Sequence, residues 1–158
     1  MCIVVDTNTL APTFNETCDR HNDFVLVKDW IDRGHGFLVF GGTKFKEELK
    51  KAHRYLRLVR LMKDSGRAVA IRDDIVDAEE ARVRALTAGT DCDDQHIIGL
   101  LCASRCPLVC SMDTRAYRYF RDRTLYPDGM VRVRIYSSRR SAALLRKPIP
   151  RARLRNLA

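Results

Sequence analysis

Acidic side chains recur at four places where strands are expected to end or adjacent helices to begin. Asp6 directly follows the β-branched run Ile3–Val5, and Asp113 follows the apolar run Leu108–Cys110. The four are Asp6, Glu48, Asp94 and Asp113. In a parallel sheet all of these places lie at the carboxyl edge, where open α/β sheets bind their ligands. Acids that meet there would form one site.

Several carboxylates gathered without a partner repel one another. Hard divalent cations relieve this repulsion, because Mg²⁺ and Mn²⁺ prefer oxygen ligands in octahedral geometry. The sequence therefore predicts a Mg²⁺ or Mn²⁺ site held by the four acids. The residues expected to orient these ligands or a water are Thr7, Asn8, Ser111 and Asp93. Turn and helix-cap duties are the alternative for the first three.

Two of the four positions have acidic neighbours that are alternative ligands. Glu47 adjoins Glu48, and Asp91 and Asp93 precede Asp94. We prefer Glu48 because the next residue, Leu49, lies on an apolar helical stripe, and Asp94 because it stands one helical turn before Ile98. His96 is a lone histidine on the same helix, and for such a residue a structural role is favoured over contact with substrate.

The net charge of +9 comes entirely from the end of the chain. Residues 131–158 contain nine Lys and Arg and no acid, whereas residues 1–130 contain 20 of each sign. A stretch of one sign is typical of a polyanion-binding segment, most often for nucleic acid. The residues expected to bind RNA are Arg139, Arg140, Arg146 and Lys147. A solvated tail that only aids solubility is the alternative.

Strand and helix patterns alternate along the chain, which predicts a single α/β domain. We expect a mostly parallel central sheet of about five strands with helices on both faces. The expected strands are 3–5, 37–40, 68–71, 108–110 and 131–136, the last at an edge because apolar and polar residues alternate in it. Residues 44–64 are expected to form one long amphipathic helix, and residues 11–23 to be irregular.

Several other classes of protein are disfavoured. No apolar run approaches the roughly 20 residues of a membrane span, so we expect a cytoplasmic protein with no membrane partner. The six cysteines lack a C-x-x-C pair and are expected to be reduced and mostly buried. No glycine-rich phosphate loop follows the first strand, and no nucleophilic Ser or Cys lies in an elbow motif.

Four short motifs, in this order, resemble those of PIN-domain nucleases over about residues 1–136. They are Ile3-Val4-Val5-Asp6-Thr7-Asn8, Glu47-Glu48-Leu49, Asp93-Asp94-Gln95-His96-Ile97-Ile98 and Cys110-Ser111-Met112-Asp113. The last resembles a family strand that ends in Thr or Ser, any residue, Asp. The resemblance implies a PIN-like domain at 1–136, followed by a basic C-terminal tail at 137–158.

The resemblance also implies an activity. PIN domains are metal-dependent endoribonucleases and are often the toxins of bacterial toxin–antitoxin pairs. The implied reaction is hydrolysis of RNA phosphodiester bonds, with Asp6, Glu48, Asp94 and Asp113 as catalytic residues and metal ligands. RNA is the implied substrate, and an antitoxin protein and a second copy of the chain are further candidate partners.

Two other functions stay open at this stage. A non-catalytic nucleic-acid-binding module on the same scaffold would share the basic segment but would have lost its active site. A phosphoryl-accepting, receiver-like domain would explain the acid after the first strand. It ranks lowest, because no clear lysine follows the last strand.

Overall fold

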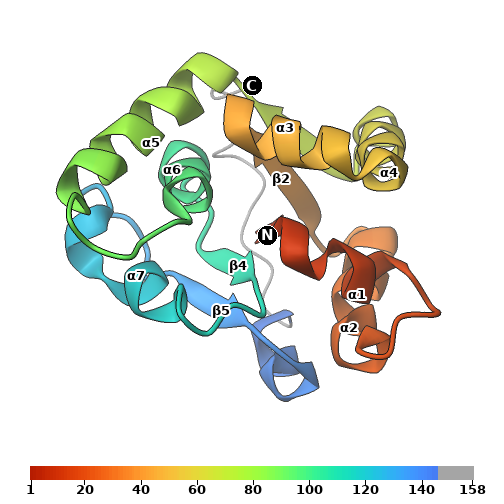
Figure 1. The fold of residues 1–158 in the computed structure, drawn as a ribbon. Coiled ribbons are helices and arrows are strands. Elements are labelled where there is room, and N and C mark those ends of the chain that lie inside the picture. Colours follow the sequence, from red (N-terminus) through yellow and green to blue (C-terminus); the bar gives the residue numbers. More distant parts are fainter. Residues whose placement is uncertain (146–158) are drawn as a thin grey trace.

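The computed structural model describes residues 1–145 and contains a five-stranded sheet of order β3-β2-β1-β4-β5 (Figure 1). The strands are β1 (Cys2–Val5), β2 (Phe37–Gly41), β3 (Ala68–Ile71), β4 (Leu108–Cys110) and β5 (Arg134–Tyr136). Every neighbouring pair is parallel. The predicted α/β class and parallel sheet are confirmed.

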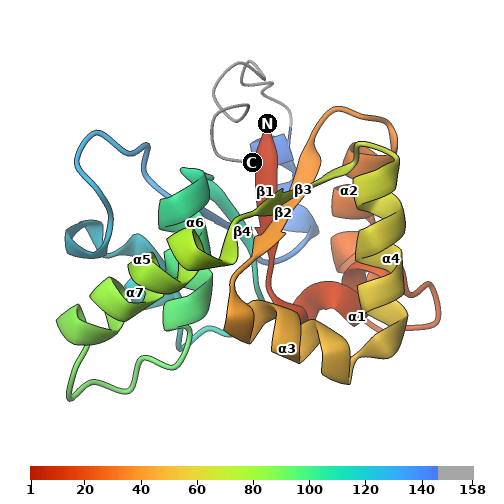
Figure 2. The ribbon, with the colours of Figure 1, turned by 90° about the horizontal axis from the view of Figure 1, so that it is seen from above.

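Helices cover both faces of this sheet, as the alternating pattern predicts. They are η1 (Thr7–Thr9), α1 (Leu10–Phe14), α2 (His21–Asp32), α3 (Thr43–Lys51), α4 (His53–Asp64), α5 (Asp73–Leu86), α6 (Gln95–Ser104), α7 (Tyr117–Arg121), η2 (Arg123–Leu125) and η3 (Arg139–Leu145). Figures 1 and 2 show α5 and α6 on one side of the strands and α1, α2 and α4 on the other. No helix within residues 1–145 is long and apolar enough to cross a membrane.

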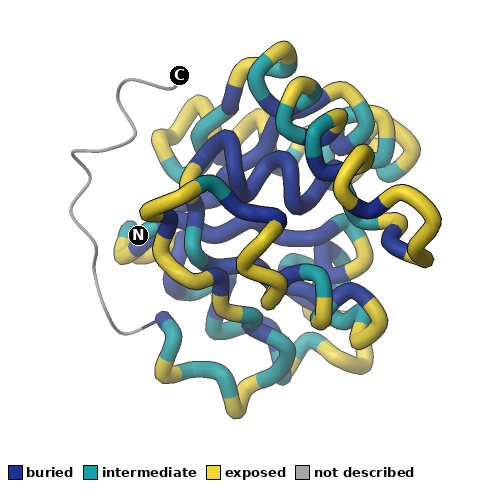
Figure 3. Tube along the Cα trace, turned by 90° about the vertical axis from the view of Figure 1, so that its left-hand side faces the viewer, coloured by how far each residue is buried: buried dark blue, intermediate teal, exposed yellow. Residues whose placement is uncertain are grey.

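The three inner strands are buried along their whole length, which explains their uninterrupted apolar sequences. Every residue of β1, β2 and β4 is buried, because helices cover each of them from both sides (Figure 3). The outer strands are less protected. Val69 in β3 is half-buried, and Arg134 in β5 is exposed. The last strand therefore lies at an edge, as predicted.

The strand order creates a switch point between β1 and β4. The chain moves from β1 through β2 to β3 in one direction, then returns to place β4 on the other side of β1. Val5 pairs with Cys110 across this junction, and the Asp6 N–H donates to the Cys110 carbonyl at 2.9 Å. Asp6 and Ser111 therefore leave the sheet side by side, at the type of crevice where such folds bind ligands.

The prediction of one helix over residues 44–64 is wrong. Two helices, α3 and α4, meet at Ala52, whose φ of −104° and ψ of 64° are not helical. The break redirects the chain, because α3 packs against β2 whereas α4 packs against the edge strand β3. Apolar residues keep their helical spacing across Ala52, so periodicity alone did not reveal the break.

Three boundaries also differ from the sequence expectation. The last strand was expected to begin at residue 131 but begins at Arg134, because it pairs with the three-residue strand β4. The stretch 11–23 is not all irregular, because α1 covers Leu10–Phe14 and α2 already begins at His21. At the other end, η3 contacts both α2 and β5, and its Leu145 is buried. Packing of the described chain thus continues past the expected domain boundary after Tyr136.

The cysteines form no disulfide. All six are free, five of them are buried, and Cys18 is partly exposed. Burial raises the pKa of Cys102 and of Cys110 to about 12 each, so these two thiols are protonated at neutral pH. They serve as small apolar side chains in the core, as the sequence predicts.

The close approach of α5 and α6 provides a test of the packing. A Cβ added to Gly99 would lie 2.7 Å from the Glu80 backbone nitrogen and 2.9 Å from its Cα. We expect Gly99→Ala to destabilise the fold by about 1–3 kcal/mol, because the backbones must separate. The intrinsic helix preference of alanine, about 1 kcal/mol, acts in the opposite direction. Urea unfolding measures the net effect, and an unchanged or higher midpoint would contradict the packing.

Candidate metal centre

Three carboxylates meet at the carboxyl edge of the sheet. Oxygen atoms of Asp93, Asp94 and Asp113 lie within 4.8 Å of one another. Asp93 and Asp94 stand directly before α6, and Asp113 follows β4. Asp93 was expected only as a supporting residue, but its carboxylate belongs to this group. The group could hold a hard divalent cation, which takes carboxylate oxygens as ligands.

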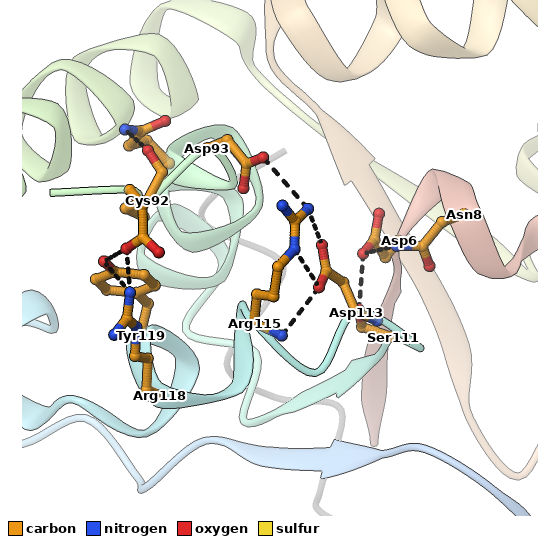
Figure 4. A network of polar contacts seen from close by, with 11 residues as sticks. Asp6, Asn8, Cys92, Asp93, Ser111, Asp113, Arg115, Arg118 and Tyr119 are labelled. Carbon is orange, nitrogen blue, oxygen red and sulfur yellow. Dashed lines mark hydrogen bonds and ion pairs between the residues drawn. The ribbon is translucent and has the colours of Figure 1, made fainter.

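Asp6 is held next to this group by two neighbouring side chains. Its carboxyl is buried, and its Oδ2 accepts hydrogen bonds from Asn8 Nδ2 and Ser111 Oγ, each at 2.8 Å (Figure 4). Burial raises the pKa of Asp6, and the Ser111 hydrogen bond partly opposes that effect. Both of these side-chain bonds use Oδ2, so the same two neighbours fix the orientation of the Asp6 carboxylate.

Glu48, rather than Glu47, faces the site. Its Oε2 accepts a hydrogen bond from Thr7 Oγ1 at 2.8 Å and lies 3.3 Å from His96 Nε2. The His96 contact is the main reason that the pKa of Glu48 is lowered. Glu47 is exposed and lines a separate groove that includes Arg84. Glu48, and not Glu47, therefore lies beside Thr7 and His96, but neither glutamate belongs to the group of Asp93, Asp94 and Asp113.

His96 has a more specific place than its sequence suggested. Its ring is buried, Nε2 faces Glu48, and Nδ1 has no hydrogen-bond partner among the described residues. Burial raises the pKa of Asp6 and of Asp94, and the nearby His96 imidazole partly opposes this rise. The available signal was its position in the first turn of the helix that begins after Asp94, which directs it toward the same sheet edge.

Asp94 is the least satisfied acid of the site. Its Oδ2 is buried and has no hydrogen-bond partner. Burial, followed by repulsion from Asp6 and Asp93, raises the pKa of Asp94 to about 6. A buried carboxylate oxygen without a donor destabilises the folded state, and a bound cation would remove that penalty. This orphaned oxygen is an observation, independent of the spacing, that fits a metal ligand.

Arg115 is the residue that sequence reasoning missed. Its Nη2 donates to Asp113 Oδ2 at 2.9 Å and lies 3.7 Å from Asp93 Oδ2. Figure 4 shows the guanidinium between these two carboxylates. This contact lowers the pKa of Asp113. The Arg115 side chain is 74% exposed, so it can swing away at little cost. A cation would compete with Arg115 for the same oxygens.

Asp91 lies apart from the cluster. Its carboxylate is exposed and is bound by Arg118 and Tyr119 from α7. These contacts lower the pKa of Asp91, with the Tyr119 hydrogen bond as the largest cause. Among the three neighbouring aspartates, the structure therefore directs Asp93 and Asp94, but not Asp91, into the group with Asp113.

The basic residues expected to bind RNA are only partly described. Arg139 and Arg140 are exposed at the start of η3. Arg146 and Lys147 lie outside the described residues. No contact of either described arginine with the acidic group is present, so their role in RNA binding stays a prediction.

Comparison with known proteins adds no relative. No protein-family model matches the chain, and no curated protein matches it. The likeness to PIN-domain nucleases therefore stays a hypothesis that depends on the four motifs and on the chemistry of the site.

Substitution of Asp94 provides a test of its unfavourable environment. A carboxyl whose pKa is raised by folding binds a proton more tightly in the folded state, so its contribution to stability falls as pH rises from about 4 to above 6. Without metal, Asp94→Asn is therefore expected to raise the urea midpoint at pH 8, and the gain should shrink near pH 4. Lower stability of the variant at pH 8 in EDTA would contradict this account.

Substitution of Arg115 tests its competition with a cation. Arg115→Ala frees Asp113 and Asp93, so we expect the dissociation constant for Mn²⁺ to fall about two- to fivefold. Arg118→Ala is the matched control, because it removes an equally exposed arginine whose partner, Asp91, lies outside the group. Calorimetric titration with Mn²⁺ measures both variants. Equal affinity in wild type and Arg115→Ala would show that the guanidinium does not compete.

Proposed function

We propose that this protein is a divalent-metal-dependent endoribonuclease that hydrolyses RNA phosphodiester bonds. The observation that carries the proposal is the convergence of acids from separate segments at the β1–β4 switch point, with the buried Oδ2 of Asp94 left unpartnered. Oxygen-only clusters of this kind suit Mg²⁺ and Mn²⁺.

The residues present fit such an ion. Asp94 and Asp113 would hold it, with Asp6 and Glu48 completing the acidic surroundings from β1 and α3. Asp93 is the further carboxylate within reach. When bound, the ion supplies Lewis-acid stabilisation of negative charge on a phosphate and activation of a water molecule.

The surrounding side chains fix how these acids are presented. Ser111 and Asn8 both bind Oδ2 of Asp6 and so fix the orientation of its carboxylate. Thr7 and His96 both contact Oε2 of Glu48 and fix the orientation of that carboxylate in the same way. Such preorganisation reduces the reorganisation that the reaction requires.

Arg115 is suited to a second task once a cation occupies the carboxylates. Its guanidinium is exposed and stays charged at all physiological pH values. A guanidinium can also donate two parallel hydrogen bonds to one phosphate group, in a bidentate contact. We assign it to the substrate phosphate next to the cleaved bond. The positive net charge of the chain supports a polyanionic substrate.

Two parts of the proposal rest on the family resemblance alone: a toxin role with an antitoxin protein as partner, and a homodimer. A cytoplasmic location is proposed from the sequence, because no apolar run is long enough for a membrane span and the six cysteines are expected to be reduced. The alternative function, a nucleic-acid-binding module without catalysis, has one observation in its favour: Arg115 already neutralises part of the acidic group. Metal-dependent cleavage separates the two functions.

Substitution of Asp6 tests the proposed activity. Asp6→Asn keeps the size of the side chain but removes its charge, so we expect the Mn²⁺-dependent cleavage rate of a labelled RNA to fall on the order of 10³-fold. Reactions in EDTA should show no cleavage by either protein. Near-normal, metal-dependent activity of the variant would remove Asp6 from the active site.

The glutamate pair offers a matched test of the same site. Glu48→Gln is expected to reduce cleavage by at least about tenfold, because it weakens the negative charge that Thr7 and His96 position. Glu47→Gln makes the same chemical change on the exposed neighbour and should leave the rate within about twofold. Loss of activity in Glu47→Gln alone would reverse the assignment.

A further inference from the structure

Positive charge is concentrated on the α3–α4 segment, although residues 1–130 as a whole are balanced. Residues 44–64 contain eight Lys and Arg and three Asp and Glu. Six of these basic residues are exposed, and we call them the α4 basic face: Lys50, Lys51, Arg54, Arg57, Arg60 and Lys63. The first two end α3, and the other four lie on α4.

None of the six forms an ion pair within the described part of the chain. Some exposed arginines elsewhere are paired, as Arg72 is with Asp74 and Arg118 with Asp91. The six differ from unpaired arginines such as Arg105 because they lie together on one segment. Adjacent like charges repel one another, and a polyanion would relieve that repulsion. Six exposed basic residues without ion pairs on one segment indicate a surface that binds an anionic partner.

The helix geometry keeps these charges pointing outward. Val59 and Met62 bury the opposite side of α4 in the core. Arg57 and Arg60 therefore project from the outer side at the spacing of one helical turn. Because the apolar side is already used for folding, α4 has only the exposed Leu61 to offer a lipid surface. The basic side chains of α4 are held on a rigid helix, which favours binding to the phosphates of a nucleic-acid backbone over insertion into a lipid surface.

The α4 basic face continues directly from the candidate metal centre. Glu48 lies on α3, one helical turn before Lys51, and the break at Ala52 then starts α4. Figure 2 shows α3 leading from the strand ends into α4 on the outside of the fold. With about 1.5 Å rise per residue, α4 extends this surface by roughly 18 Å, enough to follow several nucleotides.

We propose that the α4 basic face binds the backbone phosphates of single-stranded RNA whose cleaved bond lies at the acidic site. This inference rests on the proposed function for the identity of the ligand. The binding itself requires neither metal nor catalysis, so it can be measured separately.

The experiment compares the full chain with the variant Arg54→Gln, Arg57→Gln, Arg60→Gln. A fluorescent single-stranded RNA of about 15 nucleotides is titrated in EDTA at several salt concentrations. Loss of three phosphate contacts should reduce the slope of log K against log salt by about 2 in magnitude. The variant with lysine at all three positions should keep the wild-type slope. An unchanged slope in the glutamine variant would overturn the proposal.

The matched control removes three exposed arginines that form no ion pair among the described residues and lie outside both α4 and the basic C-terminal stretch: Arg105→Gln, Arg121→Gln, Arg123→Gln. Its slope should change by less than 1, because these side chains lie away from α4. An equal loss in this control would mean that only net charge matters, which also overturns the proposal. If the triple α4 variant fails to fold, Arg57→Gln alone should reduce the slope by about 0.7.

Two further outcomes assign the partner and separate the two proposals. Phosphatidylserine vesicles should bind the protein with no dependence on Arg54, Arg57 and Arg60. If these residues control vesicle binding while RNA binding is unchanged, the partner is a membrane and the proposal fails. If the wild type cleaves RNA with Mn²⁺ but the glutamine variant has an unchanged salt slope, the proposal for the α4 basic face is wrong and the proposed function stands. If the glutamine variant has a reduced salt slope but the wild type does not cleave RNA, the α4 basic face binds RNA and the nuclease proposal is wrong.

Discussion

The pairing of β1 with β4 is the constraint on which the candidate site depends. Val5 opposite Cys110 brings together two segments that are more than one hundred residues apart in the chain, and Asp6 and Ser111 leave the sheet as neighbours. A shift of one residue in this register would turn Ser111 to the opposite face of the sheet from Asp6 and break the hydrogen bond between them. The acids of α3 and of the turn before α6 then join them from the flanking crossovers. The site is thus a consequence of strand order rather than of any local motif.

Gathering these carboxylates opposes folding, and the structure reduces that cost in different ways. Asp6 accepts hydrogen bonds from Asn8 and Ser111, Glu48 accepts one from Thr7 and contacts His96, and Asp113 is paired with Arg115. Among the described residues, Oδ2 of Asp94 is a buried carboxylate oxygen without a hydrogen-bond partner. In proteins such unrelieved electrostatic strain concentrates at functional sites, because the ligand provides the missing interaction. Asp94 is therefore the acid that a bound cation would stabilise most.

The sequence predicted the features that depend on burial and on order along the chain. The apolar runs predicted the parallel strands, and the acids that follow them predicted the edge at which the site lies. It could not predict Arg115, because an arginine two residues after Asp113 has no periodic signal and its contact with Asp93 depends on how the two loops approach. The break at Ala52 was hidden for a similar reason, because packing against β3 overrides a continuous apolar stripe. The contact of His96 with Glu48 could not be predicted either, because the two residues are far apart in the sequence and only the fold brings them together.

The central claim is that these acids bind a divalent cation, and crystallography can test it directly. Crystals grown with Mn²⁺ and measured at a wavelength where manganese scatters anomalously should give a strong difference peak within about 2.5 Å of oxygens from Asp94 and Asp113. The account also predicts that Arg115 turns away from Asp113 in that structure. A map without a peak at this site at millimolar Mn²⁺, with Arg115 still bound to Asp113, would contradict the account.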